Sequence, residues 1–246
     1  MFELSARAQD YVERTKQFIQ NEIEPIETDF WHEVHELNQG GDWTKWQWPA
    51  QLETLKAKAK AAGLWNMFLP CPELGQGLSV QEYAHIAELT GRSLLAPTVF
   101  NCNAPDSGNM EVLWRYGSEA QKQEWLTQLL DGKIRSVFCM TEPAVASSDA
   151  TNMQATAVIE GDEIVLNGRK WWSSGLGDPN AKIIIFMAHT PDETKDRHHQ
   201  HSMVLVPVET AGVKIERMLP VFGDYDAPHG HGEISFSNVR VPVSNF

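Results

Sequence analysis

The chain has 246 residues, which is enough for one large domain or two modest ones with a buried core. Its composition, 42% hydrophobic and 22% charged, is ordinary for a soluble globular protein. A formal net charge of -13 and the lack of a dense Lys/Arg cluster exclude a surface that binds nucleic acid by displacing its counterions.

The N-terminal residues carry early acidic side chains and lack the apolar core of a signal peptide. No apolar run approaches the roughly 18 residues that a membrane span needs. The three cysteines, Cys71, Cys102 and Cys139, stand far apart, which is typical neither of a disulfide framework nor of a zinc site. We therefore expect a cytoplasmic protein of bacterial type, in a reducing compartment and without a membrane span.

The first half of the chain is predicted to be helical. Apolar residues recur every three to four positions between Ala8 and Ile26, which predicts one amphipathic helix that Pro25 ends or bends. Residues 49–62 repeat this spacing, and Gly63 is a suitable stop.

Two capping boxes predict further helix starts. Ser79 with Glu82 opens a helix that we expect to run to about Leu95, and Ser118 with Gln121 opens another.

The second half reads as short strands separated by turns. Gly161-Asp162 divides two β-rich runs, and Asn167-Gly168 marks another predicted turn. The polar stretch 190–201 is predicted to be a solvated loop. The predicted strands cover residues 154–160, 163–167, 182–189, 202–208, 213–218 and 233–241. Such a series favours a β-barrel or sandwich, so we divide the chain into a helical domain, 1–134, and a β domain, 135–246.

The segment Phe138–Asp149, FCMTEPAVASSD, lies at this junction. It begins as a strand, breaks at Pro143 and continues into small residues, several with hydroxyl groups. Such a turn can present backbone N–H groups and the hydroxyls of Thr141, Ser147 and Ser148 to one polar ligand. On composition alone, an ordinary strand end with a Ser-rich turn is the stronger interpretation.

A second candidate is the segment Gly168–Gly175, GRKWWSSG. Adjacent tryptophans on a strand point to opposite faces, so one ring can lie in the core while the other faces a cleft. A large ring beside hydroxyl groups suits a flat heteroaromatic ligand. Taken alone, a half-buried strand with one core tryptophan is the stronger interpretation.

Four motifs resemble those of the acyl-CoA dehydrogenases and occur along the chain in the same order as in that family. The segment 138–149 resembles their flavin-binding strand, and 168–175 resembles the element that follows it. Residues 117–135 match their last N-terminal helix and the lead into the barrel, and Val-Arg-Val-Pro at 239–242 resembles the closing strand of the middle domain. The Ala-Ser-Ser-Asp and Lys-Trp-Trp forms resemble the branch of acyl-CoA dehydrogenase family members ten and eleven.

This resemblance implies an α+β multidomain fold. An all-α N-terminal helical domain would precede an antiparallel β-barrel middle domain, and the family's C-terminal four-helix bundle would be absent from this chain. The implied activity is α,β-dehydrogenation of an acyl-CoA thioester, of the fatty-acid β-oxidation type, with FAD as cofactor. The family's catalytic base is a Glu on the bundle, so we assign no catalytic residue here and expect the chain alone to be nearly inactive.

The resemblance also implies roles for single residues of the flavin site. Backbone groups at Phe138 and Met140 would line the isoalloxazine ring, and Thr141 would bond its pyrimidine edge. Trp172 would stack near the ring, and Ser174 would reach toward N5.

The serine that touches cofactor and acyl-CoA in the family is Ser147 or Ser148 here, because the turn is one residue longer than usual. Substrate contacts are expected from Ser148 and, beside the pantetheine arm, from Asp226 and His229.

The implied partners are acyl-CoA, an electron-transfer flavoprotein as electron acceptor, and further copies of the chain in a dimer or tetramer of the full-length form. We expect no metal, because the histidines at 198–201 and 229–231 have no matching cysteine or carboxylate pair. Two alternatives remain: a non-catalytic acyl-CoA- or flavin-binding module, and a flavoprotein oxidase on the same fold. The acyl chain length is left open.

Overall fold

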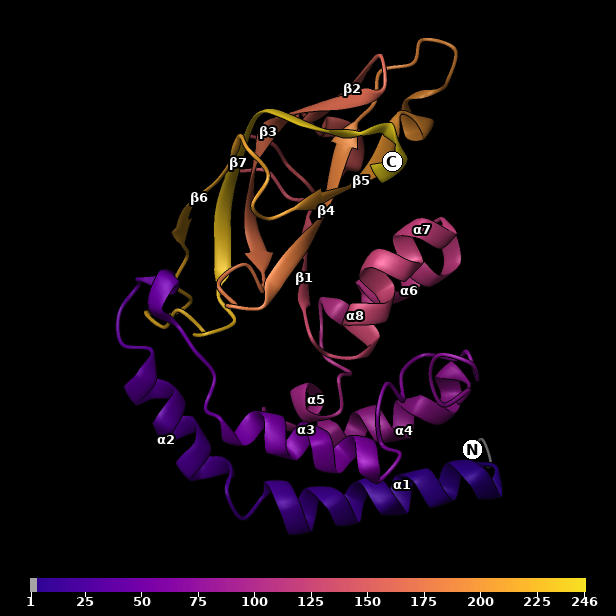
Figure 1. The fold of residues 1–246 in the computed structure, drawn as a ribbon, viewed down its shortest axis with the longest axis vertical. Helices are drawn as coiled ribbons and strands as arrows, with labels where there is room; N and C mark the ends of the chain where they lie inside the picture. Colours follow the sequence, from indigo (N-terminus) through magenta and orange to yellow (C-terminus); the bar gives the residue numbers. More distant parts are fainter. Residues whose placement is uncertain (1–3) are drawn as a thin grey trace. The chain divides into compact units, whose positions relative to one another are not determined.

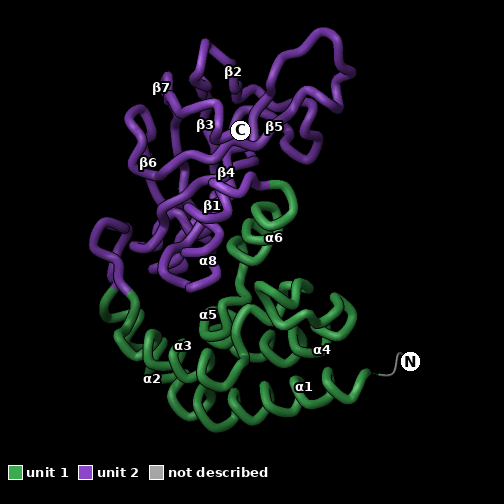
Figure 2. The backbone as a smooth tube through the Cα atoms, turned by 45° about the vertical axis from the view of Figure 1, so that its right-hand side comes forward, with its two compact units in different colours: residues 1–37, 48–116 green, residues 38–47, 117–246 purple. Residues whose placement is uncertain are grey.

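The computed structural model describes residues 4–246, and the first three residues of the N-terminal segment lie outside the described part. The chain forms two compact units, which Figure 2 colours separately. Residues 1–37 and 48–116 make the first unit, and residues 38–47 and 117–246 make the second. In the described residues, no helix combines the length and apolar character needed to cross a bilayer.

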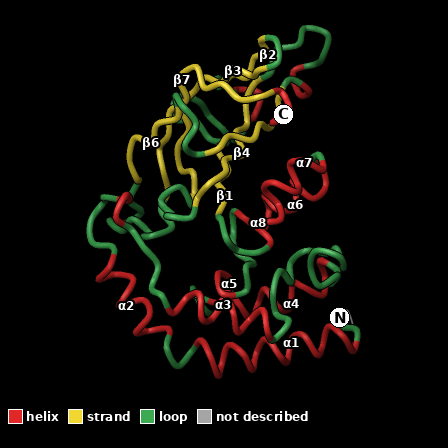
Figure 3. Tube along the Cα trace, in the orientation of Figure 1, coloured by secondary structure: helices red, strands yellow, loops and turns green. Residues whose placement is uncertain are grey.

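The first unit is helical, as predicted. The Ser5 hydroxyl caps the first helix by accepting a hydrogen bond from the Ala8 N–H group. Phe18 and Phe100 meet edge to face in its core, with ring centroids 5.3 Å apart. The elements are α1(Ala6–Phe18), a π-helical turn η1(Ile19–Ile23), α2(Glu27–Leu37), α3(Gln51–Ala61), α4(Val80–Thr90), α5(Ala96–Val99) and α6(Asp106–Tyr116) (Figures 1 and 3).

The capping box of Ser79 and Glu82 is present at the start of α4. This helix ends at Thr90, earlier than the predicted end near Leu95. The Ser93 hydroxyl accepts hydrogen bonds from the backbone N–H groups of Leu95 and Ala96 and so starts the short helix α5. A local side-chain cap therefore replaces the continued helix that apolar spacing suggested.

The second unit begins with a short helical lead and continues as a curled sheet of seven strands (Figure 1). The lead consists of α7(Glu119–Gln121), η3(Lys122–Leu126) and α8(Thr127–Leu130), and the capping box of Ser118 and Gln121 opens it as predicted. The strands are β1(Arg135–Cys139), β2(Thr156–Glu160), β3(Glu163–Ser174), β4(Ala181–His189), β5(His201–Pro207), β6(Val213–Met218) and β7(His231–Pro242).

The strand order is β1-β4-β2-β3-β7-β6, with β5 paired to the other edge of β4. Most neighbours are antiparallel, as expected, but β1 runs parallel to β4 from Arg135 to Cys139, and β2 meets β4 in parallel at Thr156 and His189. The pair of β1 and β4 carries the candidate flavin segment, which leaves the sheet directly after β1 (Figure 1).

The predicted turn at Asn167-Gly168 is wrong, because β3 continues through it to Ser174. The register against β7 shifts between Leu166 and Gly168, so these residues form a bulge within the strand. A Cβ at Gly168 would lie 2.5 Å from the Cβ of Ala155, so the glycine is explained by the close approach of β3 to the residue that precedes β2.

Trp46 comes from the segment 38–47 but lies in the core of the second unit, 4% exposed. Its indole N–H donates to the Gly40 carbonyl at 3.2 Å. A Cβ at Gly177 would lie 2.5 Å from the Trp46 ring, so the ring packs directly on that backbone. The tryptophans of residues 43–48 thus divide between the two units, since Trp48 packs against the helical core of the first unit.

Candidate functional site

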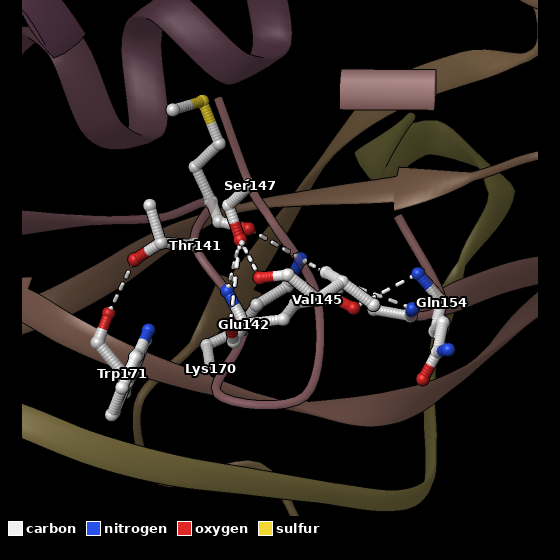
Figure 4. A network of polar contacts seen from close by, with 9 residues as sticks. Thr141, Glu142, Val145, Ser147, Gln154, Lys170 and Trp171 are labelled. Carbon is white, nitrogen blue, oxygen red and sulfur yellow. Dashed lines mark hydrogen bonds and ion pairs between the residues drawn. The ribbon is translucent and has the colours of Figure 1, made fainter. Parts of the chain in front are cut away.

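The turn after β1 is built around a buried ion pair between Glu142 and Lys170 (Figure 4). Lys170 Nζ lies 2.8 Å from Glu142 Oε1 and donates to the Met140 carbonyl at 2.9 Å. The other contacts of the Glu142 carboxylate are with the backbone N–H groups of Gln154 and Ala155, at 2.9 and 3.0 Å. Glu142 and its lysine partner therefore orient the backbone of the turn.

Burial lowers the pKa of Lys170, and its hydrogen bond to Glu142 opposes this effect. The Lys170 Nζ atom also lies 5.2 Å from the centre of the Phe186 ring. These contacts fix the start of the turn from three sides, so the ion pair positions the segment that follows β1. It is a structural element of the site and leaves no side chain free for a ligand.

Thr141 connects the turn to β3. Its Oγ1 donates to the Trp171 carbonyl at 2.7 Å, and the Trp171 N–H donates to the Thr141 carbonyl at 3.0 Å. The hydroxyl hydrogen of Thr141 is therefore used within the chain, and only its oxygen lone pairs are open to a ligand.

The two candidate serines differ sharply in their contacts. Ser147 Oγ accepts from the Glu142 N–H at 2.9 Å and so closes the turn internally. Ser148 is exposed, and its hydroxyl makes no hydrogen bond within residues 4–246. The geometry thus favours Ser148 as the serine that can reach a ligand.

The two tryptophans do not take opposite faces of β3, so that prediction is wrong. Trp172 has a left-handed φ of 53°, and the register against β7 shifts between Lys170 and Ser173. This bulge breaks the alternation of side chains and brings the two indole rings within 6.2 Å, centre to centre. Trp171 is half-buried and Trp172 is 43% exposed, and neither belongs to the core.

A left-handed backbone costs a bulky residue on the order of 1–3 kcal/mol and is concentrated at functional sites. At Trp172 it holds a large apolar ring partly in water, where burial does not stabilise it. Met140, 37% exposed, places a second apolar side chain at the start of the same turn, and Phe138 precedes it half-buried in β1.

A small depression lies in this turn. Its lining mixes an apolar wall with carboxylate and hydroxyl groups, and it is formed by Met140, Glu142, Val145, Ser147, Asp149, Ala150 and Met153. The Asp149 carboxylate pairs with Arg197 at 3.3 Å and accepts a hydrogen bond from the Thr151 hydroxyl at 2.7 Å. Most of its lining comes from the Phe138–Asp149 segment, and all of it lies in the second unit.

At the end of β3 stands a chain of three polar side chains. Ser174 Oγ lies 2.9 Å from His231 Nδ1, and His231 Nε2 lies 3.3 Å from Asp226 Oδ2. The His231 ring is 6.3 Å from the ring of Trp172. The structure therefore brings Ser174 and Trp172 of the segment Gly168–Gly175 close to His231, and His231 connects them to Asp226.

His229 lies beside this chain, with its ring 6.1 Å from that of His231. Burial lowers the pKa of His229 to about 4, and the neighbouring Arg135 cation acts in the same direction. His229 is thus neutral near pH 7 and offers a ligand one N–H donor and one acceptor. Among the described residues, no group of three His, Cys, Asp or Glu could hold a metal ion.

Cys139 is fully buried, and burial raises the pKa of its thiol to about 12. Its sulfur is therefore a poor nucleophile.

Sequence reasoning missed Lys170 and His231. Lys170 sat inside the quoted motif, and a lone lysine between strand residues could have suggested a buried ion pair. In the sequence, His231 stands out only as part of a histidine pattern that could suggest a metal site. Its contact with Ser174 follows from their pairing across β3 and β7, which sequence spacing does not reveal.

Comparisons with known proteins agree with the two-part organisation. Residues 5–133 match the family described as acyl-CoA dehydrogenase, N-terminal domain, and residues 137–239 match acyl-CoA dehydrogenase, middle domain. Mouse acyl-CoA dehydrogenase family member 11 is 51% identical over 248 residues, which cover all of this chain and 31% of that protein. The chain thus spans about a third of the length of such curated relatives.

A Mycobacterium tuberculosis protein assigned as acyl-CoA dehydrogenase FadE2 is 50% identical over 246 residues, covering 99% of this chain and 58% of its own length. A solved Mycobacterium abscessus structure assigned as an acyl-CoA dehydrogenase has a TM-score of 0.94 and 60% identity, over 100% of this chain and 61% of its own. A Mycobacterium smegmatis glutaryl-CoA dehydrogenase in complex with FADH2 has a TM-score of 0.72 at 22% identity, over 98% and 55% of the two chains, and so shares the fold.

Proposed function

This chain belongs to the acyl-CoA dehydrogenase family, and we propose that it supplies the flavin site and part of the substrate site of an FAD-dependent acyl-CoA dehydrogenase. Its helical and β parts would act as the N-terminal domain, 1–134, and the middle domain, 135–246. The observation that carries the proposal is Trp172, a half-exposed indole held by a left-handed bulge beside the Phe138–Asp149 turn.

The residues at this place suit a flavin. A flat heteroaromatic ring with one polar edge needs an apolar wall and a few placed hydrogen-bonding groups. Trp172 and Met140 supply exposed apolar surface, and Thr141 and Ser148 supply hydroxyl oxygens with open lone pairs. When bound, FAD would take up the β hydrogen of the acyl thioester as a hydride.

The proposed roles follow from the contacts of each residue. Thr141 would accept a hydrogen bond from an N–H of the pyrimidine edge, because its own hydrogen is donated to Trp171. Phe138 and Met140 would contribute backbone groups beside the ring, and Trp172 would contact its face. Ser147 would act indirectly, by closing the turn through Glu142.

Substrate contacts are proposed for Ser148, Asp226 and His229. Ser148 has a hydroxyl open to donate and accept, and neutral His229 can bond an amide of the pantetheine arm without carrying a charge. We assign no base for the α proton to any residue of this chain. An electron-transfer flavoprotein as acceptor, assembly with further copies of the chain and a cytoplasmic location remain predictions.

The test is reconstitution of the 246-residue chain with FAD, followed by gel filtration and absorbance of the retained flavin. We expect retained flavin with quenched tryptophan fluorescence, and a further spectral change on adding an acyl-CoA. A folded chain that retains no flavin and shows no spectral response to acyl-CoA would refute the proposal. Rapid turnover with an artificial acceptor would instead show that this chain contains a base that we have not assigned.

A further inference from the structure

Ser174 and His231 face each other where β3 ends and β7 begins, as direct partners in the antiparallel register. The 2.9 Å contact between Ser174 Oγ and His231 Nδ1 is therefore set by strand pairing. The loop that carries Asp226 is tied to the same place, since the Gly230 N–H donates to the Asp226 carbonyl and the Gly175 N–H donates to the Gly230 carbonyl, at 2.8 and 2.9 Å.

The direction of the hydrogen bonds follows from the chemistry of the three groups. An ionised carboxylate can only accept, so Asp226 at 3.3 Å favours a hydrogen on His231 Nε2. In a neutral imidazole, Nδ1 is then the acceptor, and the hydroxyl of Ser174 must donate to it. The hydrogen of Ser174 is thus turned toward His231, and its lone pairs remain open to a ligand.

We propose that His231 and Asp226 are positioning residues that hold Ser174 as a hydrogen-bond acceptor toward its ligand. The inference rests on the proposed flavin site and on the role that the family resemblance implies for Ser174, whose hydroxyl would reach toward N5 of the ring. The reduced ring carries a hydrogen on N5 that Ser174 can accept, whereas the oxidised ring has a bare N5 that needs a donor. The arrangement therefore favours the reduced form over the oxidised form.

Serine, histidine and aspartate also form hydrolytic triads, in which a buried aspartate stabilises an imidazolium. Here the Asp226 side chain is 58% exposed, so water weakens that effect. Release of free thiol from an acyl-CoA by the flavin-free chain, lost in Ser174→Ala, would show that the three residues form a hydrolytic site and would overturn the proposal.

The first test needs no flavin. In the ¹⁵N-histidine-labelled chain at pH 7.5, long-range ¹H–¹⁵N spectra report which ring nitrogen carries hydrogen, and His231→Phe assigns the signal. We expect the neutral form with hydrogen on Nε2, and a shift toward the other tautomer in Asp226→Asn, whose amide can donate as well as accept. Finding a cationic ring, or hydrogen on Nδ1 alone, would overturn the proposal.

The second test measures the reduction potential of the bound flavin. His231→Phe frees the Ser174 hydroxyl to donate to the oxidised ring and so stabilises the oxidised form. We expect the equilibrium constant for reduction to fall roughly tenfold, which lowers the reduction potential by about 30 mV for a two-electron couple. The same substitution should leave the reduction potential unchanged in a Ser174→Ala background, because the hydroxyl through which His231 acts has been removed. His198→Phe, on the exposed loop, is the matched control and should leave the potential unchanged.

An equal shift from His231→Phe in both backgrounds would show that His231 acts on the fold and not through Ser174. Circular dichroism of each variant identifies a variant that fails to fold, and Asp226→Asn then serves in its place. If no variant or parent chain binds flavin, the proposed flavin site fails, while the tautomer measurement still decides the hydrogen-bond direction.

Discussion

Lys170 Nζ and Glu142 Oε1 lie 2.8 Å apart, with 0% and 5% of their side chains exposed to solvent. The pair joins the middle of β3 to the turn that follows β1, and Glu142 also accepts from two backbone N–H groups. The lysine is thus enclosed with its partner at the start of the turn that follows β1. Removing either one leaves a buried charge with fewer partners.

We expect Lys170→Met to lower the free energy of unfolding by about 3–5 kcal/mol, because it leaves the Glu142 carboxylate buried without its cation. Glu142→Gln added to it should recover part of the loss. Urea unfolding followed by tryptophan fluorescence measures both. Lys182→Met, which breaks a mostly exposed pair with Glu209, should change stability by less than about 1 kcal/mol. Equal losses at Lys170 and Lys182 would contradict this account.

Gly177→Ala should destabilise the second unit by roughly 1–3 kcal/mol, because a Cβ there would meet the Trp46 ring at 2.5 Å. Gly108 lies within α6, where a Cβ meets nothing within 4 Å. Gly108→Ala should therefore be neutral or stabilise by about 0.5–1 kcal/mol. Thermal unfolding distinguishes the two, and a harmless Gly177→Ala would mean that the Trp46 ring can move aside.

Stability should fall as the pH drops from 6.5 toward 4, partly because of His229. Burial holds the pKa of this imidazole at about 4 in the folded chain, below its ordinary 6.5. Between these values the unfolded chain binds a proton and the folded chain does not, so folding weakens by up to about 3 kcal/mol.

The variant His229→Asn should flatten this part of the pH profile of urea unfolding. The charged and titratable groups around the ring are Arg135, Asp226, Asp178 and His231, and all remain in the variant. An unchanged profile would assign the acid sensitivity to other groups.

Trp172→Ala should weaken FAD binding roughly tenfold, as expected for the loss of about 1.5 kcal/mol of aromatic contact. Stability should change little, because the ring is half exposed and its left-handed backbone is strained. Phe222→Ala removes another exposed aromatic ring with a left-handed φ, of 51°, and is the control. Flavin fluorescence titration measures both affinities, and equal effects would remove Trp172 from the site.

Substitution of the two serines of the turn, Ser147 and Ser148, should affect different properties of the chain. Ser147→Ala should cost about 1 kcal/mol of stability, because the Glu142 N–H loses its acceptor. Ser148→Ala should leave stability unchanged and weaken the spectral response to acyl-CoA, since its hydroxyl has no partner within the described chain. The opposite assignment would place the family's serine at Ser147.

Local patterns gave the helices and most strand positions. The capping boxes at Ser79 and Ser118 are present because a cap involves only residues a few positions apart. The motif order located the turn after β1, and its implied roles for single residues stay predictions. Contacts between residues far apart in the sequence could not be predicted from local patterns. The bulge at Trp172 depends on pairing with β7, and the Glu142–Lys170 pair joins the turn after β1 to β3.

The parallel pairing of β1 with β4 has a consequence for the order of folding. β1 pairs with β4, and β2 and β3 lie between these two strands in the sequence. Pairing of β1 with β4 therefore closes a long loop, which carries a high entropic cost. Hairpins such as β2–β3 need only a short closure and can form first. We expect the segment that follows β1 to become ordered late in folding and to exchange its amide hydrogens early in the native state.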